Sequence, residues 1–292
     1  MAILLDGKQV SRKVLLELTP EIEKINARLH PHTLRLVIVM VGSHPASEVF
    51  IKRKKEVGMA LGITVDIRRF PEHIATNKLR AEVATIARDK TVRGIVVQLP
   101  LPPHIHEQKI LDAVPVEKDV DVLGYKAAGK FYVNNREFTI LPSTLAGILR
   151  LLHEYGLDDF TGKNVVVAGS GKLVGKPAIN YFMRKEASAS AFNIRSRTTD
   201  KAGALKMADI IISGAGSQGL ITGEMVTDGV VVVDAGASKD PNTGKLVGDV
   251  DFESVEPKAS YITPVPGGVG PMTVAMIFYN LVQLTKQRLK IK

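Results

Sequence analysis

The feature that most constrains the fold is the regular alternation of short apolar runs with amphipathic stretches along the whole chain. The apolar runs lack period-two alternation, which is typical of strands covered on both faces. The stretches between them carry apolar residues at helical spacing. This pattern predicts α/β domains with largely parallel sheets. The expected strands are residues 34–41, 63–68, 94–98, 164–168, 189–194, 209–212 and 230–234.

The length of 292 residues suggests two domains. The alternation fades over residues 126–142, where a polar stretch precedes Pro142. We therefore predict an N-terminal domain of residues 1–142, onto which a C-terminal helix at 271–292 packs back, and a second domain of residues 143–270. Pro20 interrupts an otherwise helical N-terminal segment, so a kink or break is expected there.

Composition excludes several classes of protein. The chain has no cysteine, which rules out disulfides and thiolate metal sites. Its histidines lack partners at ligand spacing, so no metal site is expected. No apolar run approaches the roughly 18 residues of a membrane span, and the N-terminus lacks the pattern of a signal peptide. A soluble cytoplasmic protein without membrane contact is the expectation.

The net charge of +9 has two interpretations. It could mark a nucleic-acid partner, or it could belong to a solvated basic surface. The densest basic cluster, residues 52–55, lacks the flanking aromatic side chains that would stack on bases. We therefore expect no nucleic-acid partner, and note that a positive field also suits a small polyanionic substrate or cofactor.

A glycine-rich turn follows the apolar run at residues 165–168. Gly169, Ser170 and Gly171 begin it, and Gly175 precedes a helical pattern. Strand, glycine turn and helix form the context of a dinucleotide phosphate site, because the backbone can approach the pyrophosphate and the helix N-terminus offers free N–H groups. The spacing is one residue longer than the common fingerprint. A purely structural role for these glycines stays open.

A basic segment lies about twenty-five residues beyond that turn. Arg195, Ser196 and Arg197 occupy the region where NAD sites usually place an acid for the ribose hydroxyls. Cations and a hydroxyl suit the additional phosphate of NADP. The segment therefore favours NADP, with a solvated basic loop as the alternative.

Three further segments could contribute to a site. Lys54 follows Phe50 by four residues on a predicted helix, and burial beside a ring would lower its pKa, although most helical lysines are solvated. Gln98 ends a buried strand, where ligand sites of open α/β sheets form. Asp119 and Asp121 would point the same way if their segment is extended.

The loop at residues 263–273 packs three prolines and three glycines into a short segment. Proline fixes φ and glycine lets backbone approach a ligand, so such a loop suits binding. A tight crossing between domains is an equal interpretation.

These segments, in this order, carry a family resemblance. The matches lie at residues 41–47, 98–102, 118–121, 174–177, 248–251 and 263–273. Over essentially its whole length the chain resembles the bifunctional methylene-tetrahydrofolate dehydrogenase/methenyl-tetrahydrofolate cyclohydrolase family of one-carbon metabolism. The resemblance implies an N-terminal folate domain, a C-terminal Rossmann-like NADP domain, an active-site cleft between them and a homodimer. It also implies tetrahydrofolate derivatives as substrates, which could be polyglutamylated.

The resemblance assigns roles position by position. Lys54 matches the catalytic lysine, Gln98 the glutamine that tunes it, and Asp121 the carboxylate that holds the pterin ring. The positions expected against folate are Phe50, Pro264, Pro266, Gly267 and Gly268. The positions expected against the cofactor are Gly169, Ser170, Gly171, Ser196 and Ala237, with Arg195 or Arg197 as the phosphate-binding cation.

The match breaks at several of these positions. Phe50 replaces the usual tyrosine, so a hydroxyl near Lys54 is absent. Val122 replaces a glycine, and residues 123–129 also differ. Further departures lie at residues 143–145, 170–171 and 195. Our hypothesis is that hydride transfer survives and cyclohydrolysis is weakened. The alternatives are a monofunctional dehydrogenase and a catalytically silent folate- or nucleotide-binding protein.

Overall fold

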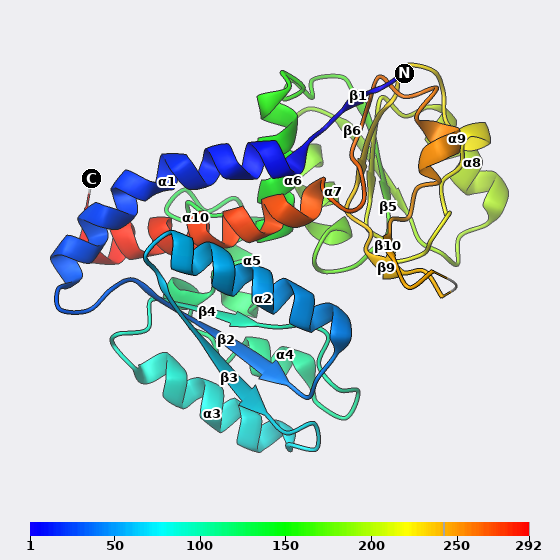
Figure 1. Cartoon of the computed structure of the whole chain (residues 1–292). Helices are drawn as coiled ribbons and strands as arrows, with labels where there is room; N and C mark the ends of the chain where they lie inside the picture. Colours follow the sequence, from blue (N-terminus) through cyan, green and yellow to red (C-terminus); the bar gives the residue numbers. More distant parts are fainter. Residues whose placement is uncertain (242, 292) are drawn as a thin grey trace. The chain divides into compact units, whose positions relative to one another are not determined.

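The computed structural model describes residues 1–241 and 243–291, which form two compact units. Unit 1 comprises residues 1–12 and 144–273, and unit 2 comprises residues 13–143 and 274–292. The chain passes from one unit to the other within α1 (Gly7–Leu29), at the start of α6 (Ser143–Glu154) and within α10 (Val269–Leu289) (Figure 1).

Unit 2 contains a three-stranded parallel sheet in the order β3-β2-β4. Its strands are β2 (Arg35–Val41), β3 (Thr64–Phe70) and β4 (Gly94–Val97). Its helices are α2 (Pro45–Ala60), α3 (Thr76–Arg88), α4 (Glu107–Leu111) and α5 (Tyr125–Tyr132), with a 3-10 turn, η1, at Val116–Lys118.

The central strand β2 is covered on both faces, as its uninterrupted apolar pattern predicts. Val37 and Val39 pack with Leu79 and Val83 of α3 on one face. α2 lies on the opposite face of the sheet (Figure 1). The chain order reverses between β2 and β4, because β3 adds to one side of β2 and β4 to the other. Such a reversal point is where open parallel sheets form ligand sites.

Unit 1 contains a six-stranded, wholly parallel sheet in the order β1-β11-β8-β7-β5-β6. Its strands are β1 (Ile3–Leu4), β5 (Asn164–Ala168), β6 (Ser188–Phe192), β7 (Ile210–Ser213), β8 (Val231–Asp234) and β11 (Tyr261–Ile262). The order reverses between β5 and β7. Its other elements are α7 (Gly175–Met183), α8 (Thr198–Lys206), α9 (Phe252–Val255), η2 (Gly223–Met225) and a short antiparallel pair, β9 (Ser238–Lys239) and β10 (Leu246–Val247).

The predicted two-domain α/β fold with a Rossmann-like parallel sheet is confirmed, and each predicted strand is present. The two-residue strands β1 and β11 are too short for any periodic pattern, and they pair with each other. This pairing places residues 1–12 in unit 1, whereas the predicted boundaries placed them in the N-terminal domain.

Pro20 does not break helix α1, so of the two expected outcomes, a kink or a break, the break is wrong. Helix α1 is continuous from Gly7 to Leu29 with Pro20 inside it. Pro20 lies on the exposed side of the helix, and so does Leu16, whose carbonyl loses its intrahelical partner. Water can satisfy that carbonyl, so the proline is tolerated. Among the described residues, no helix combines the length and the apolar character that a membrane crossing needs.

Candidate active site and cofactor site

Lys54 is a buried lysine on α2. His44 and Pro45 start this helix, with proline at a position where its missing N–H is not needed. The Lys54 side chain is only 6% exposed, and its Nζ donates a hydrogen bond of 2.9 Å to Oε1 of Gln98. Gln98 follows β4 directly and continues the ladder by donating its backbone N–H to Val39 at 2.9 Å. The two side chains therefore meet at the reversal point of the unit 2 sheet.

The surroundings of Lys54 favour its neutral form. Burial lowers the pKa of Lys54, and the negative charge of nearby Asp121 partly opposes this effect. Gln98 donates its Nε2 to the carbonyl of Leu99 at 2.8 Å, which turns its amide oxygen towards Lys54. An amine held in this way can accept a proton from a water molecule.

Asp119 and Asp121 have different environments, and the condition under which their carboxylates were expected to point the same way, an extended segment, is not met. The segment forms turns after η1 and is not an extended strand. Asp119 is 4% exposed, and its Oδ2 accepts N–H bonds from Leu123 at 3.0 Å and Gly124 at 2.8 Å. Burial raises the pKa of Asp119 to about 7, against the effect of its N–H donors. Asp119 thus fixes the backbone at Leu123 and Gly124. Asp121 is only partly buried, and its negative charge opposes the lowering of the pKa of Lys54.

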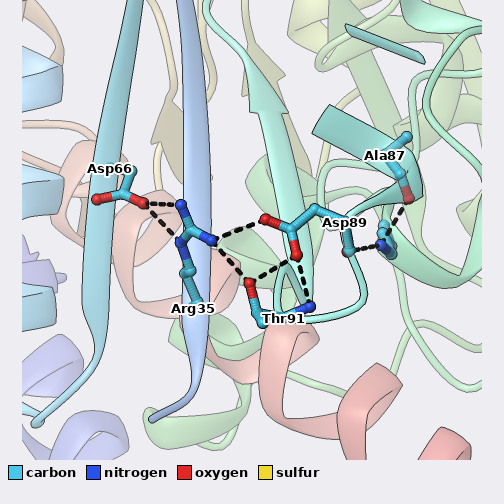
Figure 2. A network of polar contacts seen from close by, with 6 residues as sticks. Arg35, Asp66, Ala87, Asp89 and Thr91 are labelled. Atoms are coloured by element: carbon cyan, nitrogen blue, oxygen red, sulfur yellow. Dashed lines mark hydrogen bonds and ion pairs between the residues drawn. The ribbon is translucent and has the colours of Figure 1, made fainter. Parts of the chain in front are cut away.

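Lys118 anchors this segment to the end of α3. Its buried Nζ donates to the carbonyls of Ala87 at 2.6 Å and Asp89 at 2.7 Å, at the end of α3. Figure 2 shows how Asp89 is itself held: its carboxylate accepts from Arg35 at 2.9 Å and from the backbone of Thr91 at 2.8 Å. Sequence reasoning missed this role, because a lysine beside acidic residues resembles a solvated surface position.

Val122 lies in the backbone stretch that Asp119 holds. It is buried and has a φ of +59°, in the left-handed region that glycine adopts freely. A β-branched residue there costs on the order of 1–2 kcal/mol. Valine in place of the family's glycine therefore puts backbone strain directly next to Asp121.

The glycine-rich turn after β5 forms a backbone cradle in unit 1. Gly169 has a φ of +115°, and a Cβ there would lie 2.6 Å from the carbonyl oxygen of Gly214. A Cβ on Gly175 would lie 2.1 Å from the carbonyl oxygen of Gly169. These two glycines are required by packing. Gly171 has no protein atom within 4 Å of an added Cβ, so its open side leaves room for a ligand at the start of α7.

The basic segment after β6 presents two exposed arginines, one on either side of Ser196. Ser196 Oγ accepts the N–H of Asn193 at 3.1 Å, which fixes the turn. Arg197 is exposed and pairs with Asp200 at 2.9 Å. Within the described residues, the exposed Arg195 side chain makes no hydrogen bond or ion pair. Its guanidinium is therefore the freer of the two to bind an additional phosphate.

The proline- and glycine-rich loop follows β11. Gly267 has a φ of +127°, and Gly268 donates its N–H to Pro264 at 2.8 Å. Pro266 and Ala237, which follows β8, are exposed. Because carboxyl ends of parallel strands meet at one edge of a sheet, this loop, Ala237 and the glycine-rich turn share one edge of unit 1.

The arrangement is that of a two-domain dehydrogenase in which a dinucleotide cradle accompanies a second site for proton transfer. Comparison with known proteins agrees. Residues 5–121 match the tetrahydrofolate dehydrogenase/cyclohydrolase catalytic domain, and residues 142–289 match the NAD(P)-binding domain of the same family. The chain belongs to the tetrahydrofolate dehydrogenase/cyclohydrolase family.

Its relatives match it over nearly their full length. Bifunctional protein FolD of a Sulfurihydrogenibium strain is 41% identical over 98% of this chain and 99% of its own length. The FolD crystal structure from Campylobacter jejuni is 38% identical with a TM-score of 0.92, and covers 99% of this chain and 100% of its own. The Trypanosoma brucei enzyme, complexed with NADP cofactor and inhibitor, is 32% identical with a TM-score of 0.94, and covers 99% of each chain.

The predicted family is confirmed. With it, the comparisons support the predicted dehydrogenase/cyclohydrolase function: this chain carries the catalytic and NAD(P)-binding domains of the family, and the Trypanosoma brucei relative holds NADP.

Proposed function

We propose that unit 2 holds the folate and runs the hydrolytic step with Lys54 as the base, and that unit 1 holds NADP. The protein thereby oxidises methylene-tetrahydrofolate to methenyl-tetrahydrofolate and hydrolyses it to formyl-tetrahydrofolate. The observation that carries the proposal is the buried Lys54 Nζ, 2.9 Å from Gln98 Oε1 at the end of β4.

In the hydrolytic step, water adds to the methenyl carbon and must lose a proton. The neutral amine of Lys54 accepts that proton and becomes an ammonium, while the new C–O bond discharges the methenyl cation. One of the two C–N bonds to this carbon then breaks: the hydroxyl proton passes to the departing nitrogen, the C=O of the formyl group forms, and Lys54 releases its proton to solvent. Gln98 directs one N–H of the amine towards its own oxygen, which leaves the lone pair free to face the water. Asp121 stabilises the ammonium that forms, and in this proposal also binds the pterin nitrogens.

The oxidation step requires no proton acceptor from the protein. NADP, when bound, accepts the hydride from the bridging methylene. The chain's residues only need to hold the rings in contact and exclude water. In this proposal Gly169, Ser170, Gly171 and Ala237 lie along the cofactor, and Arg195 with Ser196 binds its additional phosphate. Phe50 and the loop at residues 264–268 pack on the folate.

The missing hydroxyl at Phe50 supports a second candidate, a dehydrogenase with weakened hydrolysis. Phe50 lies on α2 one turn before Lys54 and is half-buried. A tyrosine there could hydrogen-bond near the amine, whereas phenylalanine can only pack.

One spectrophotometric run separates the two candidates. Purified protein receives methylene-tetrahydrofolate and NADP, and reduced cofactor and methenyl species are followed together. Reduced cofactor rising without methenyl accumulation, faster than spontaneous hydrolysis, supports both activities. Equal rises in both signals mean that hydrolysis has failed. No signal in either channel, with NAD also tested, refutes the proposal in favour of a silent binding protein.

The homodimer inferred from the family resemblance and the cytoplasmic location inferred from the composition stay predictions. Light scattering at micromolar concentration tests the first, since a homodimer has twice the chain mass of 31.6 kDa.

A further inference from the structure

Two buried carboxylates in unit 1 have no role in the chemistry described above. Asp249 is completely buried and Asp234 is 3% exposed. Neither forms an ion pair with a cation in the described part of the chain, and the negative charge of Asp249 adds to burial in raising the pKa of Asp234 to about 6. Burying two like charges is costly unless they are fully hydrogen-bonded, so their partners indicate what they do.

Asp249 holds the loop that follows β7. Its Oδ2 accepts from Ser213 Oγ at 2.7 Å and from the N–H of Ala215 at 2.6 Å, and its Oδ1 accepts from the N–H of Ser217 at 2.8 Å. A carboxylate can accept all three donors, whereas an asparagine amide offers one acceptor oxygen and two N–H groups.

Asp234, the last residue of β8, holds the loop that follows it. Its Oδ1 accepts from Gly236 at 2.8 Å and its Oδ2 accepts from Val250 at 2.9 Å. Each carboxylate packs against a glycine from the segment that carries the other carboxylate. A Cβ on Gly248 would lie 1.9 Å from Asp234 Oδ2, and a Cβ on Gly236 would lie 2.4 Å from Asp249 Oδ1.

Both loops lie at the edge of the sheet that carries the dinucleotide cradle. The loop after β7 contacts the cradle directly, because Gly169 packs against the backbone of Gly214. The loop after β8 continues into Ala237. A shift of either loop would therefore alter the backbone around the point where the strand order reverses, which is where open parallel sheets bind ligands.

We propose that Asp249 and Asp234 are positioning residues for NADP: by hydrogen-bonding the loops after β7 and β8, they set the shape of the crevice that receives the dinucleotide. This inference rests on the proposed placement of NADP at this edge. Its consequence is that cofactor affinity depends on two acids that do not contact the reacting atoms. Sequence reasoning assigned neither a role, although residues 248–251 were among the motifs that carried the resemblance.

The test compares Asp249→Asn with Asp251→Asn. Asparagine has nearly the same shape as aspartate, but its amide NH2 group would face one of the donors that Asp249 now accepts from, so that hydrogen bond would be lost. Asp251 lies two residues away, is exposed, and makes no side-chain hydrogen bond to the helix it precedes, so it is a matched control. The KM for NADP and the kcat of the dehydrogenase are measured, together with cyclohydrolase turnover of methenyl-tetrahydrofolate without NADP.

We expect Asp249→Asn to raise the KM for NADP by about tenfold or more, as for the loss of one to two hydrogen bonds to a charged group. The kcat at saturating NADP should change less than about threefold, and Asp251→Asn should match the wild type. Unchanged cyclohydrolase turnover shows that the variant is folded. A KM within about twofold of the control overturns the proposal, even if the variant is less stable.

Ser213→Ala keeps the test decisive if Asp249→Asn does not fold. It removes one of the three donors to Asp249 and introduces no new polar group. A smaller rise in the KM for NADP, about two- to fivefold, is expected, and no rise contradicts the proposal. Failure of the wild-type protein to use NADP would instead contradict the proposed function.

Discussion

Lys54→Met is the substitution that most directly separates the two activities. Methionine has nearly the same length and shape, fits the buried site, and cannot accept a proton. Removal of a general base slows its step by about 10²–10⁴-fold, which is about 3–5 kcal/mol in the activation barrier. Hydride transfer needs no base, so the kcat of the dehydrogenase should stay within about threefold of the wild-type value.

The same substitution should also stabilise the fold at neutral pH. Because burial lowers the pKa of Lys54, the unfolded chain binds its proton more tightly than the native protein does. Stability of the wild type should therefore rise as pH increases from the folded pKa towards the unfolded value of about 10.4. Lys54→Met lacks this penalty, so its gain in unfolding free energy should be larger at pH 7 than at pH 10.

The assays are cyclohydrolase turnover of methenyl-tetrahydrofolate, dehydrogenase turnover with NADP, and urea unfolding at pH 7 and pH 10. Lys55→Met is the matched control, since Lys55 is the next residue on α2 and is exposed. Cyclohydrolase activity of Lys54→Met within about tenfold of wild type would refute the assignment of the base. A parallel loss of both activities would mean that Lys54 holds the substrate instead.

Five other substitutions test the site and the fold separately. Phe50→Tyr should raise cyclohydrolase turnover about two- to tenfold, as for one added hydrogen bond, with the dehydrogenase unchanged; no gain contradicts the explanation by the missing hydroxyl. Arg195→Ala should raise the KM for NADP about tenfold or more without changing the KM for NAD. Arg197→Ala should raise the KM for NADP less, because Arg197 already pairs with Asp200. If Arg197→Ala has the larger effect, Arg197 and not Arg195 binds the phosphate. Since burial raises the pKa of Asp119 to about 7, the native state binds its proton more tightly than the unfolded chain, so stability should fall as pH rises from about 4 to 7. This loss of unfolding free energy is at most a few kcal/mol, at about 1.4 kcal/mol per pKa unit. It should be absent from Asp119→Asn when urea unfolding is compared at pH 5 and pH 8. If Asp119→Asn loses as much stability between these pH values as the wild type, other groups cause the loss. Gly203→Ala on the exposed side of α8, where an added Cβ meets nothing within 4 Å, should raise the unfolding free energy by about 0.5–1 kcal/mol, and a loss of stability would show that α8 is not formed as described.

The amino-acid sequence alone predicts the fold class, the family, and every strand of the two main sheets except β1 and β11. Apolar runs such as residues 34–41 and 164–168 identify buried strands because burial on both faces selects apolar side chains without regard to what lies opposite. The motifs at residues 41–47, 98–102 and 263–273 are among the six that identify the family, because all six occur in the family's order.

Local pattern could not decide what depends on partners distant in the chain. Strands β1 and β11 exist because they pair with each other across the length of the sequence. Lys118, Asp119 and Asp121 belong to one motif, but the fold gives them different roles. Lys118 is buried against the end of α3 and Asp119 against the turn that follows it, while the negative charge of Asp121 influences the pKa of Lys54.

The roles of Asp234 and Asp249 likewise required the tertiary structure. In the sequence they are two acids among 30 acidic residues. Their burial, and the donors that Ser213, Ala215 and Val250 bring to them, arise only when the ends of separate parallel strands meet at one edge. Burial and hydrogen bonding set the charge state and the role of a side chain, and both depend on neighbours that the fold supplies.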